Sequence, residues 1–415
     1  LHYPLRRQRQ MCIRDRVNVY SDTIANPVKG ATVKVKKDGV DIATETTDED
    51  GRTPQITLET VDKSYTEEEQ HEVRPYETYD VTVTALGLTP TTIEGVQIFD
   101  GVTSIQNIYL TSIDENQKGE TSVITPNTLW QEYPQNIISE EELPQEEYTP
   151  LVLSEVVVPE NIVVHDGIPT NFSAPNYTVP FIDYIKNVAS SEIYSTWPTE
   201  TIKANVLAII SYTLNRIYTE WYRSRGYDFT ITSTTSYDQK YTVNGTIFEP
   251  ISRVVDEIFT NYIRQGYRPE PLLAHYKSST TEPGNLSQWG SKELGDRGYN
   301  YLEILKYYYG NNINIAEAET TQSYPYSFSG TLKEGDCNRD VYKLQNTLNY
   351  IRGSYPGIPV IKNPSGLFDS NTTKAVKKFQ EVFKLSPTGT VNFQTWYMIS
   401  YIFIAVSKMT NSIYS

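Results

Sequence analysis

One carboxylate occupies an unusual place in the sequence. The apolar residues Phe181, Ile185 and Val188 recur at the spacing of one helix face, and the next position on that face is Glu192. Burial disfavours the charged form of a carboxyl group, so an inward-facing Glu should have a raised pKa and remain protonated near neutral pH. General acid catalysis requires such a group. The spacing also fits a Glu at the edge of the stripe, ending in solvent or paired with a Lys.

Two helices must position this carboxylate. The first begins near Phe181 and is interrupted at Trp197 and Pro198, because Pro lacks the backbone N–H and fixes φ. The second begins near Thr199, and its run over 204–215 contains no charged residue, which indicates burial on nearly all sides. The rest of this region predicts mixed structure. It comprises a strand stretch over 227–245, a helix with apolar residues from Ile251 to Tyr262, a strand over 272–276, a polar turn over 287–290 and a helix over 301–309.

Length and charge narrow the classes of protein and partner. A chain of 415 residues should hold two to four domains. The net charge is −15, and residues 1–16 contribute +4, which leaves −19 for the rest. This balance argues against nucleic acid and anionic membranes and favours a neutral or mixed-charge polymer such as a glycan. Cys12 and Cys337 allow neither a disulfide framework nor a Cys-based zinc site.

The first residues do not read as part of a fold. Residues 1–16 are rich in Arg, begin without Met and have no apolar stretch after the Arg residues, so they do not form a signal peptide. The string resembles translated adapter sequence, and we expect it to be an artefact or disordered, with any signal missing. No run elsewhere approaches the roughly 20 apolar residues of a membrane span.

Residues 17–112 predict an all-β sandwich. Short alternating strands surround Val33, Tyr79 and Ile105, and Asp-Gly pairs at 38–39, 50–51 and 100–101 predict turns. The segments 27–33, 47–51 and 79–87 resemble the carboxypeptidase regulatory-like (transthyretin-like) domain, which implies a spacer or adhesive module. Residues 113–170 then predict an acidic linker, with Glu clustered over 140–147 and short strands near 156–158 and 162–164.

Residues 171–312 predict a central α+β domain. Its motifs are Tyr184 to Ile193, Trp197-Pro198, Ile202 to Ala204, Tyr212, Tyr237 to Tyr241, Leu286 to Gly290, Gly298-Tyr299 and Leu302 to Gly310. In this order, over about 140 residues, they resemble the stage II sporulation protein D family.

The resemblance implies a function and a set of site residues. Members of that family are lytic transglycosylases, which cleave peptidoglycan strands without water and leave a 1,6-anhydro sugar end. Their catalytic Glu aligns with Glu192. The match also implies substrate-binding roles for a set of polar and aromatic residues, although the aromatic ones could equally be core. The set comprises Gln239, Tyr241, Ser278, Gln288 and Trp289.

The sequence departs from that family in two segments. Sporulation members hold zinc with His and Cys in the region corresponding to 227–241, where this chain has neither. They also carry a Gly-rich His-Gly segment, where this chain has residues 281–285. His275 alone cannot form a metal site, so we expect neither a metal nor another cofactor.

We expect a polar linker over residues 313–330 and a three-helix all-α module over 331–410. Leu344 and Leu348 lie one turn apart on its first helix, and Ala375, Val376 and Phe379 share a face of its second. These residues resemble the peptidoglycan-binding domain. Further matches to that domain are Leu332 to Gly335, Asp340-Val341, Gln345, Gly366 to Asp369, Thr373, Gln380, Leu385, Thr388-Gly389, Val391 and Thr395-Trp396.

The whole chain therefore predicts an extracytoplasmic protein of the cell wall or spore envelope whose partner is peptidoglycan glycan. Its wall module would raise the effective concentration of glycan at the central domain. That domain would act as a lytic transglycosylase through Glu192. Two alternatives remain open. One is a non-catalytic wall or spore-surface scaffold, and the other is a phage lysis or tail protein. The sequence does not specify an oligomeric state.

Overall fold

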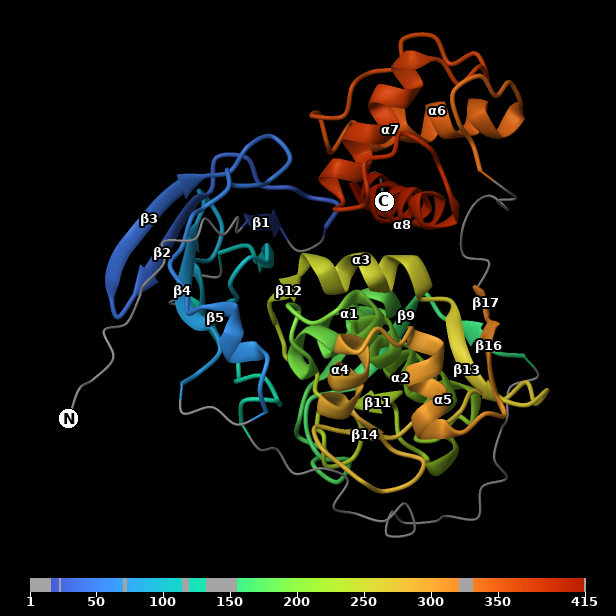
Figure 1. Ribbon diagram of the computed structural model, residues 1–415. Helices are drawn as coiled ribbons and strands as arrows, with labels where there is room; N and C mark the ends of the chain where they lie inside the picture. Colours follow the sequence, from blue (N-terminus) through green and yellow to red (C-terminus); the bar gives the residue numbers. More distant parts are fainter. Residues whose placement is uncertain are drawn as a thin grey trace.

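The protein contains three packed units, as its computed structural model shows (Figure 1). The structure describes residues 16–21, 24–69, 73–113, 119–131, 155–320 and 331–413. The expected acidic cluster over 140–147, Cys12 and residues 1–15 lie outside these ranges. Arg16, expected to belong to an artefact or disordered start, is instead the first residue of strand β1 (Arg16–Ser21) and pairs with Ile105.

The N-terminal unit is a β-sandwich, as predicted. One sheet has the order β3-β2-β4-β5-β7, and the other has the order β1-β6-β12. Side chains alternate across the pleat, so Val33 and Val35 point into a core that Val19 and Ile108 share from the opposite sheet. The strands are β2 (Thr32–Lys37), β3 (Val40–Thr46), β4 (Glu77–Thr84), β5 (Thr91–Ile98), β6 (Ser104–Leu110) and β7 (Glu120–Val123), with a 3-10 turn η1 (Lys63–Thr66).

Two strands of this sandwich come from outside 17–112. Strand β7 pairs in parallel with β5, although its residues fall in the expected linker. Strand β12 (Ile247–Phe248) pairs antiparallel with β6, although its residues belong to the expected central domain. The second sheet is therefore shared between two units, which fixes them to each other through backbone hydrogen bonds.

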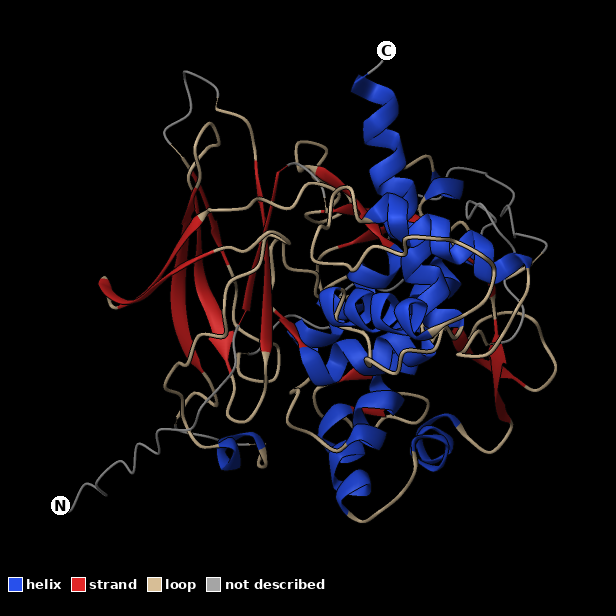
Figure 2. Ribbon diagram, turned by 90° about the horizontal axis from the view of Figure 1, so that it is seen from above, coloured by secondary structure: helices blue, strands red, loops and turns tan. Residues whose placement is uncertain are grey.

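Helix α2 (Thr199–Tyr218) is the axis of the central unit. It packs against α1 (Phe181–Glu192), α3 (Glu249–Ile258), α4 (Gln288–Asp296) and α5 (Tyr301–Tyr309). Every residue from 204 to 215 is buried, which confirms the expectation from its uncharged run. Seen from above, these helices lie together beside the strands of the sandwich (Figure 2).

Small sheets surround these helices. Strand β9 (Asn161–His165) lies between β10 (Asn176–Pro180) and β11 (Ile231–Thr232), and β14 (Tyr276–Lys277) pairs with β15 (Leu286–Ser287). The others are β13 (Asn261–Gln265) with β16 (Ile313–Glu317), and β8 (Val157–Val158) with β17 (Glu319–Thr320); a 3-10 turn η3 spans Arg223–Arg225.

Three local expectations for these segments were wrong. Within 227–245 only Ile231 and Thr232 form a strand, and within 272–276 only Tyr276 does. The expected linker from 313 instead begins with β16, which pairs with β13. The Thr and Tyr residues that suggested a strand over 227–245 mostly bond across turns; for example, the Asp238 N–H donates to the Thr234 carbonyl.

The C-terminal unit contains α6 (Arg339–Ile351), α7 (Ser370–Val382) and α8 (Phe393–Ile413) around one apolar core, as predicted. Helix α8 lies over α3 (Figure 1), where the rings of Tyr397 and Phe259 meet at 4.6 Å. Among the helices in the described ranges, none combines the length and apolar character needed to cross a bilayer.

Candidate active site

Glu192 is the last residue of α1, at the point where the chain turns away from the helix. The next residue, Ile193, has extended backbone, so the helix ends there and the Glu192 side chain leaves its final turn. The residue is 2% exposed. The Thr128 hydroxyl donates to its carbonyl oxygen over 3.3 Å, which fixes the same turn from the other side. The alternative of a solvent-exposed Glu at the edge of the stripe is therefore wrong.

Two donors hold the Glu192 carboxyl group. The Lys240 N–H donates to Oε1 over 2.6 Å, and the Tyr276 hydroxyl donates to Oε2 over 2.5 Å. Burial raises the pKa of Glu192 to about 7, while these two hydrogen bonds lower it by a smaller amount. The group therefore titrates near neutral pH, where a carboxyl group can donate a proton and then accept one.

The Lys240 N–H is held in place by a buried network around Asp238. The Asp238 side chain forms an ion pair with Arg216 at 3.0 Å and also accepts hydrogen bonds from Tyr212, Tyr222 and both donors of Thr232. These partners come from α2, the segment after it and β11. Because every strong acceptor position on Asp238 is used, the residue fixes the turn rather than acting on a ligand.

Gln239 fixes the same turn from the other side. It is fully buried, and its Oε1 accepts from the hydroxyls of Tyr184 and Thr213, while its Nε2 donates to the Ile209 carbonyl. Gln239 thus fixes the backbone next to Lys240, whose N–H is one of the two donors to Glu192.

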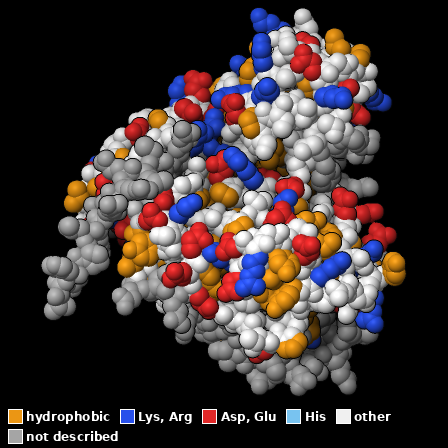
Figure 3. All heavy atoms as spheres, viewed as in Figure 1, with side chains coloured by type: hydrophobic (Ala, Val, Ile, Leu, Met, Phe, Trp, Pro, Cys, Tyr) orange, Lys and Arg blue, Asp and Glu red, His pale blue; other side chains and the backbone are white. Residues whose placement is uncertain are grey.

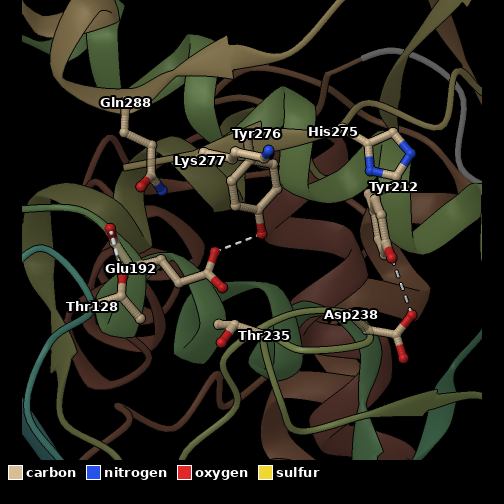
Figure 4. A pocket seen from close by; sticks show the side chains of 9 residues that line it. All are labelled: Thr128, Glu192, Tyr212, Thr235, Asp238, His275, Tyr276, Lys277 and Gln288. Atoms are coloured by element: carbon tan, nitrogen blue, oxygen red, sulfur yellow. Dashed lines mark hydrogen bonds between the residues drawn. The ribbon is translucent and has the colours of Figure 1, made fainter. Parts of the chain in front are cut away.

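A small pocket opens in front of the Glu192 carboxyl group, with a volume of about 30 Å³. Figure 4 shows the carboxyl group between Tyr276 and Thr235, with Gln288 pointing into the pocket from the N-terminus of α4. Asp238 and Tyr212 lie at the far side. The lining residues are Thr128, Glu192, Tyr212, Thr235, Asp238, His275, Tyr276, Lys277 and Gln288. A volume of this size holds water but not a sugar ring.

The structure places the expected substrate-binding residues in different environments. Of these five, Gln288 alone lines the pocket with Glu192. Trp289 packs against Trp197 and Tyr194 in the core, and Tyr241 stacks on Tyr184 at 5.6 Å. Ser278 accepts the Trp289 N–H with its carbonyl oxygen.

Other residues enter the pocket that the sequence did not single out as site residues. Tyr276 is the most important, because its hydroxyl donates directly to the Glu192 carboxyl group. Thr128 and Thr235 lie beside Glu192 (Figure 4). Tyr276 ended the predicted strand over 272–276, and no local pattern there indicated that its hydroxyl would reach Glu192. Thr128 lies far from any motif, and no local pattern indicates it.

The zinc site of sporulation members does not fit this chain. Within 227–241 the carboxylate of Asp238 is already saturated by protein donors, and the segment has no His or Cys. Among the described residues, no group of three or more His, Cys, Asp or Glu is arranged to hold a metal ion. The exposed Cys337 lies in the C-terminal unit.

Comparison with known proteins agrees with two of these units. Residues 174–259 match the family model "Stage II sporulation protein", and residues 338–399 match "Putative peptidoglycan binding domain". No curated protein matches the chain. One similar solved structure is a "putative membrane-associated protein of unknown function" from Bacteroides fragilis, with 14% identity and a TM-score of 0.14 over 32% of this chain and 34% of that one. The chain thus joins a region similar to stage II sporulation proteins to a module similar to peptidoglycan-binding domains.

Proposed function

We propose that this protein binds cell-wall peptidoglycan and cleaves its glycan strands as a lytic transglycosylase, outside the cytoplasm. The observation that carries the proposal is the Glu192 carboxyl group, which is buried, has a pKa of about 7 and faces a pocket shared with Gln288. The two family matches support the polymer, because both belong to proteins of the wall or sporulation.

The proposed reaction uses Glu192 twice. Protonated Glu192 donates its proton to the glycosidic oxygen as the bond between that oxygen and C1 breaks. The resulting carboxylate takes the proton from the C6 hydroxyl of the same sugar while that oxygen bonds to C1, so a 1,6-anhydro ring forms and Glu192 is protonated again. One carboxyl group suffices because the nucleophile belongs to the substrate.

The surroundings of Glu192 support a mechanism with one carboxyl group. The other carboxylate at the pocket, Asp238, is paired with Arg216 and fully hydrogen-bonded, so it is not available as a second catalytic group. The pocket must widen before a sugar can reach Glu192. We propose that this happens on the side of Tyr276 and Lys277, since the turn over 279–284 beyond them is largely exposed and pairs Lys277 with Glu282 at 2.8 Å.

The test is the substitution Glu192→Gln, which keeps the shape of the side chain but cannot transfer a proton. We expect release of products with anhydro ends from peptide-free glycan strands to fall by about 10²- to 10⁴-fold, as measured by mass spectrometry. Glu293→Gln, on the exposed surface of α4, is the matched control and should retain activity. Equal product release by the Glu192→Gln variant would exclude Glu192 as the acid.

A non-catalytic wall protein is the second candidate. It is favoured by the small volume of the pocket and by the two protein donors that already occupy the Glu192 oxygens. In that case purified protein would sediment with peptidoglycan and release no anhydro product at any pH. Binding together with product release would instead select the enzyme.

A further inference from the structure

A cavity with a volume of about 670 Å³ lies where the three units meet. The sandwich contributes the segment 101–103, the central unit contributes Trp197 and the first turns of α2 and α3, and the C-terminal unit contributes residues after α7 and at the start of α8. Lys, Arg, Asp and Glu side chains gather along the seam between the C-terminal unit and the others (Figure 3). Known ligand pockets have volumes of about 300–1,000 Å³.

The walls of this junction cavity suit a saccharide. Hydroxyl and amide side chains line it from two units, among them Thr199, Ser386, Thr388 and Asn392. Apolar side chains line it as well, among them Trp197, Ile202 and Leu385. Sugars present hydroxyl groups at the ring edge and C–H groups on the ring face, so this mixture of polar and apolar walls matches their surface.

Three carboxylates and two cations line the cavity, and Lys384 is the lining cation that pairs with no carboxylate in the described part of the chain. Glu249 pairs with Arg253 at 2.5 Å, Asp256 with Lys186 at 2.7 Å and Glu257 with Lys203 at 2.7 Å. Lys384 also lines the cavity, and among the described residues no carboxylate oxygen lies within ion-pair distance of its ammonium group. A ligand that supplies a carboxylate would pair with this cation.

Lys384 occupies a backbone position that normally favours Gly. It follows the last turn of α7 with φ at +63°, and the Leu385 N–H donates to the Gln380 carbonyl, which closes the helix in a Schellman motif. Burial and the nearby cations Arg16 and Arg52 lower the pKa of Lys384 to about 7. A long cation is thus held where the backbone prefers Gly and where its charge is disfavoured, so it gains from a bound anion.

We propose that the junction cavity binds a carboxylate-bearing saccharide segment of the wall glycan, with Lys384 pairing with the carboxylate of the sugar acid. Muramic acid residues carry such a carboxylate on their lactyl group when no peptide is attached to it. The cavity would then distinguish bare strands from peptide-substituted ones, at a site formed by all three units and separate from the Glu192 pocket. This inference rests on the proposed wall polymer but not on catalysis.

The experiment measures binding by calorimetry with the full chain carrying Glu192→Gln, so that turnover does not interfere. The probes are a peptide-free tetrasaccharide of alternating N-acetylglucosamine and N-acetylmuramic acid, chitotetraose, which lacks the carboxylate, and the first tetrasaccharide with peptides on its lactyl groups. We expect the peptide-free acid to bind at least tenfold more tightly than the other two. Adding Lys384→Gly should remove that preference.

Two further comparisons separate a binding role from a folding role. Gly suits φ of +63°, so the Lys384→Gly variant should be as thermally stable as its parent. Ser386→Trp should fill the cavity and weaken binding, whereas Ser370→Trp, on the exposed first turn of α7, should not.

Unchanged preference in the Lys384→Gly variant, or equal binding of chitotetraose, would overturn the proposal. Tighter binding of the peptide-bearing strand would assign the carboxylate to the peptide and overturn the lactyl assignment. Product release from the chain without Glu192→Gln tests the catalytic proposal separately.

Discussion

At the scale of single residues, two opposing effects set the behaviour of Glu192. Removal from water favours the neutral acid, while the Lys240 N–H and the Tyr276 hydroxyl favour the carboxylate. Burial dominates, and the pKa rises to about 7 from the ordinary 4.5. Without the two donors the acid would be harder to ionise, and without burial it would be ionised at neutral pH. In the proposed reaction, this balance would let Glu192 serve first as acid and then as base.

The raised pKa predicts how stability depends on pH. Below pH 4.5 Glu192 is protonated in both folded and unfolded chains. Between pH 4.5 and about 7 the unfolded chain loses this proton while the folded one keeps it, so rising pH favours unfolding. The loss levels off above pH 7 at about 3 kcal/mol. The Glu192→Gln variant lacks this effect, so urea titrations across pH 4–8 should show its stability rising relative to the native chain. A constant difference across that range would contradict the prediction.

Tyr276 offers a second test at this scale. Its hydroxyl lowers the pKa of Glu192, so Tyr276→Phe should raise that pKa further and leave Glu192 protonated to higher pH. We expect the pH at which glycan cleavage declines to move upward by up to about one unit. Tyr309→Phe is the matched control, because that hydroxyl donates to the His275 carbonyl and does not contact Glu192. A profile that stays in place would mean that Tyr276 does not control the proton.

The sequence allowed part of this site to be predicted. The position of Glu192 followed from the spacing of Phe181, Ile185 and Val188, because neighbours on a helix face are set locally. Its donors did not follow in the same way, because Lys240 and Tyr276 lie 48 and 84 residues away along the chain. Only the tertiary fold brings them together.

At the scale of elements, prediction succeeded where one force dominated. Helices α1, α2 and α5 begin where expected, because apolar periodicity and Pro198 define α1 and α2, and a capping box at Asn300 starts α5. The stretch 227–245 failed, because its residues favour strands by type but are used for turns that saturate Asp238. Here side-chain hydrogen bonding decided the backbone conformation.

The packing of α4 on α2 predicts a sensitive Gly. A Cβ at Gly295 would overlap the Thr201 hydroxyl and lie 3.4 Å from its Cβ, so the two helices approach closely there. Gly295→Ala should destabilise the chain by about 1–3 kcal/mol and displace Gln288 at the other end of α4. Combining it with Thr201→Ala should recover part of that loss, which a double-mutant cycle in urea would detect. Strict additivity of the two changes would show that the helices do not meet at this point.

At the scale of the whole molecule, the three units are joined more closely than the sequence indicated. Strand β12 completes a sheet of the sandwich, the Gln394 side chain donates to the Glu257 carbonyl, and Arg52 reaches the Glu381 carbonyl at 3.4 Å. We therefore propose domain boundaries that differ from those expected. The sandwich extends beyond residue 112 to Val123, and the central unit extends beyond residue 312 to Thr320. Linker composition could not reveal this, because these contacts join residues more than a hundred positions apart.

The contact between the sandwich and the C-terminal unit can be tested at Gly357. Its N–H donates to Asp50 over 3.1 Å, and Asp50 also forms a buried ion pair with Arg52 at 3.0 Å. A Cβ at Gly357 would overlap the Asp50 carboxylate, so Gly357→Ala should force the two units apart while each stays folded. Small-angle scattering should then show a larger radius of gyration. Gly353→Ala is the control, since its Cβ meets only the Tyr350 carbonyl within the same unit.

Because the junction cavity needs all three units, the Gly357→Ala variant should also lose its preference for the acidic tetrasaccharide. An unchanged radius together with an unchanged preference would show that this contact does not hold the units in place.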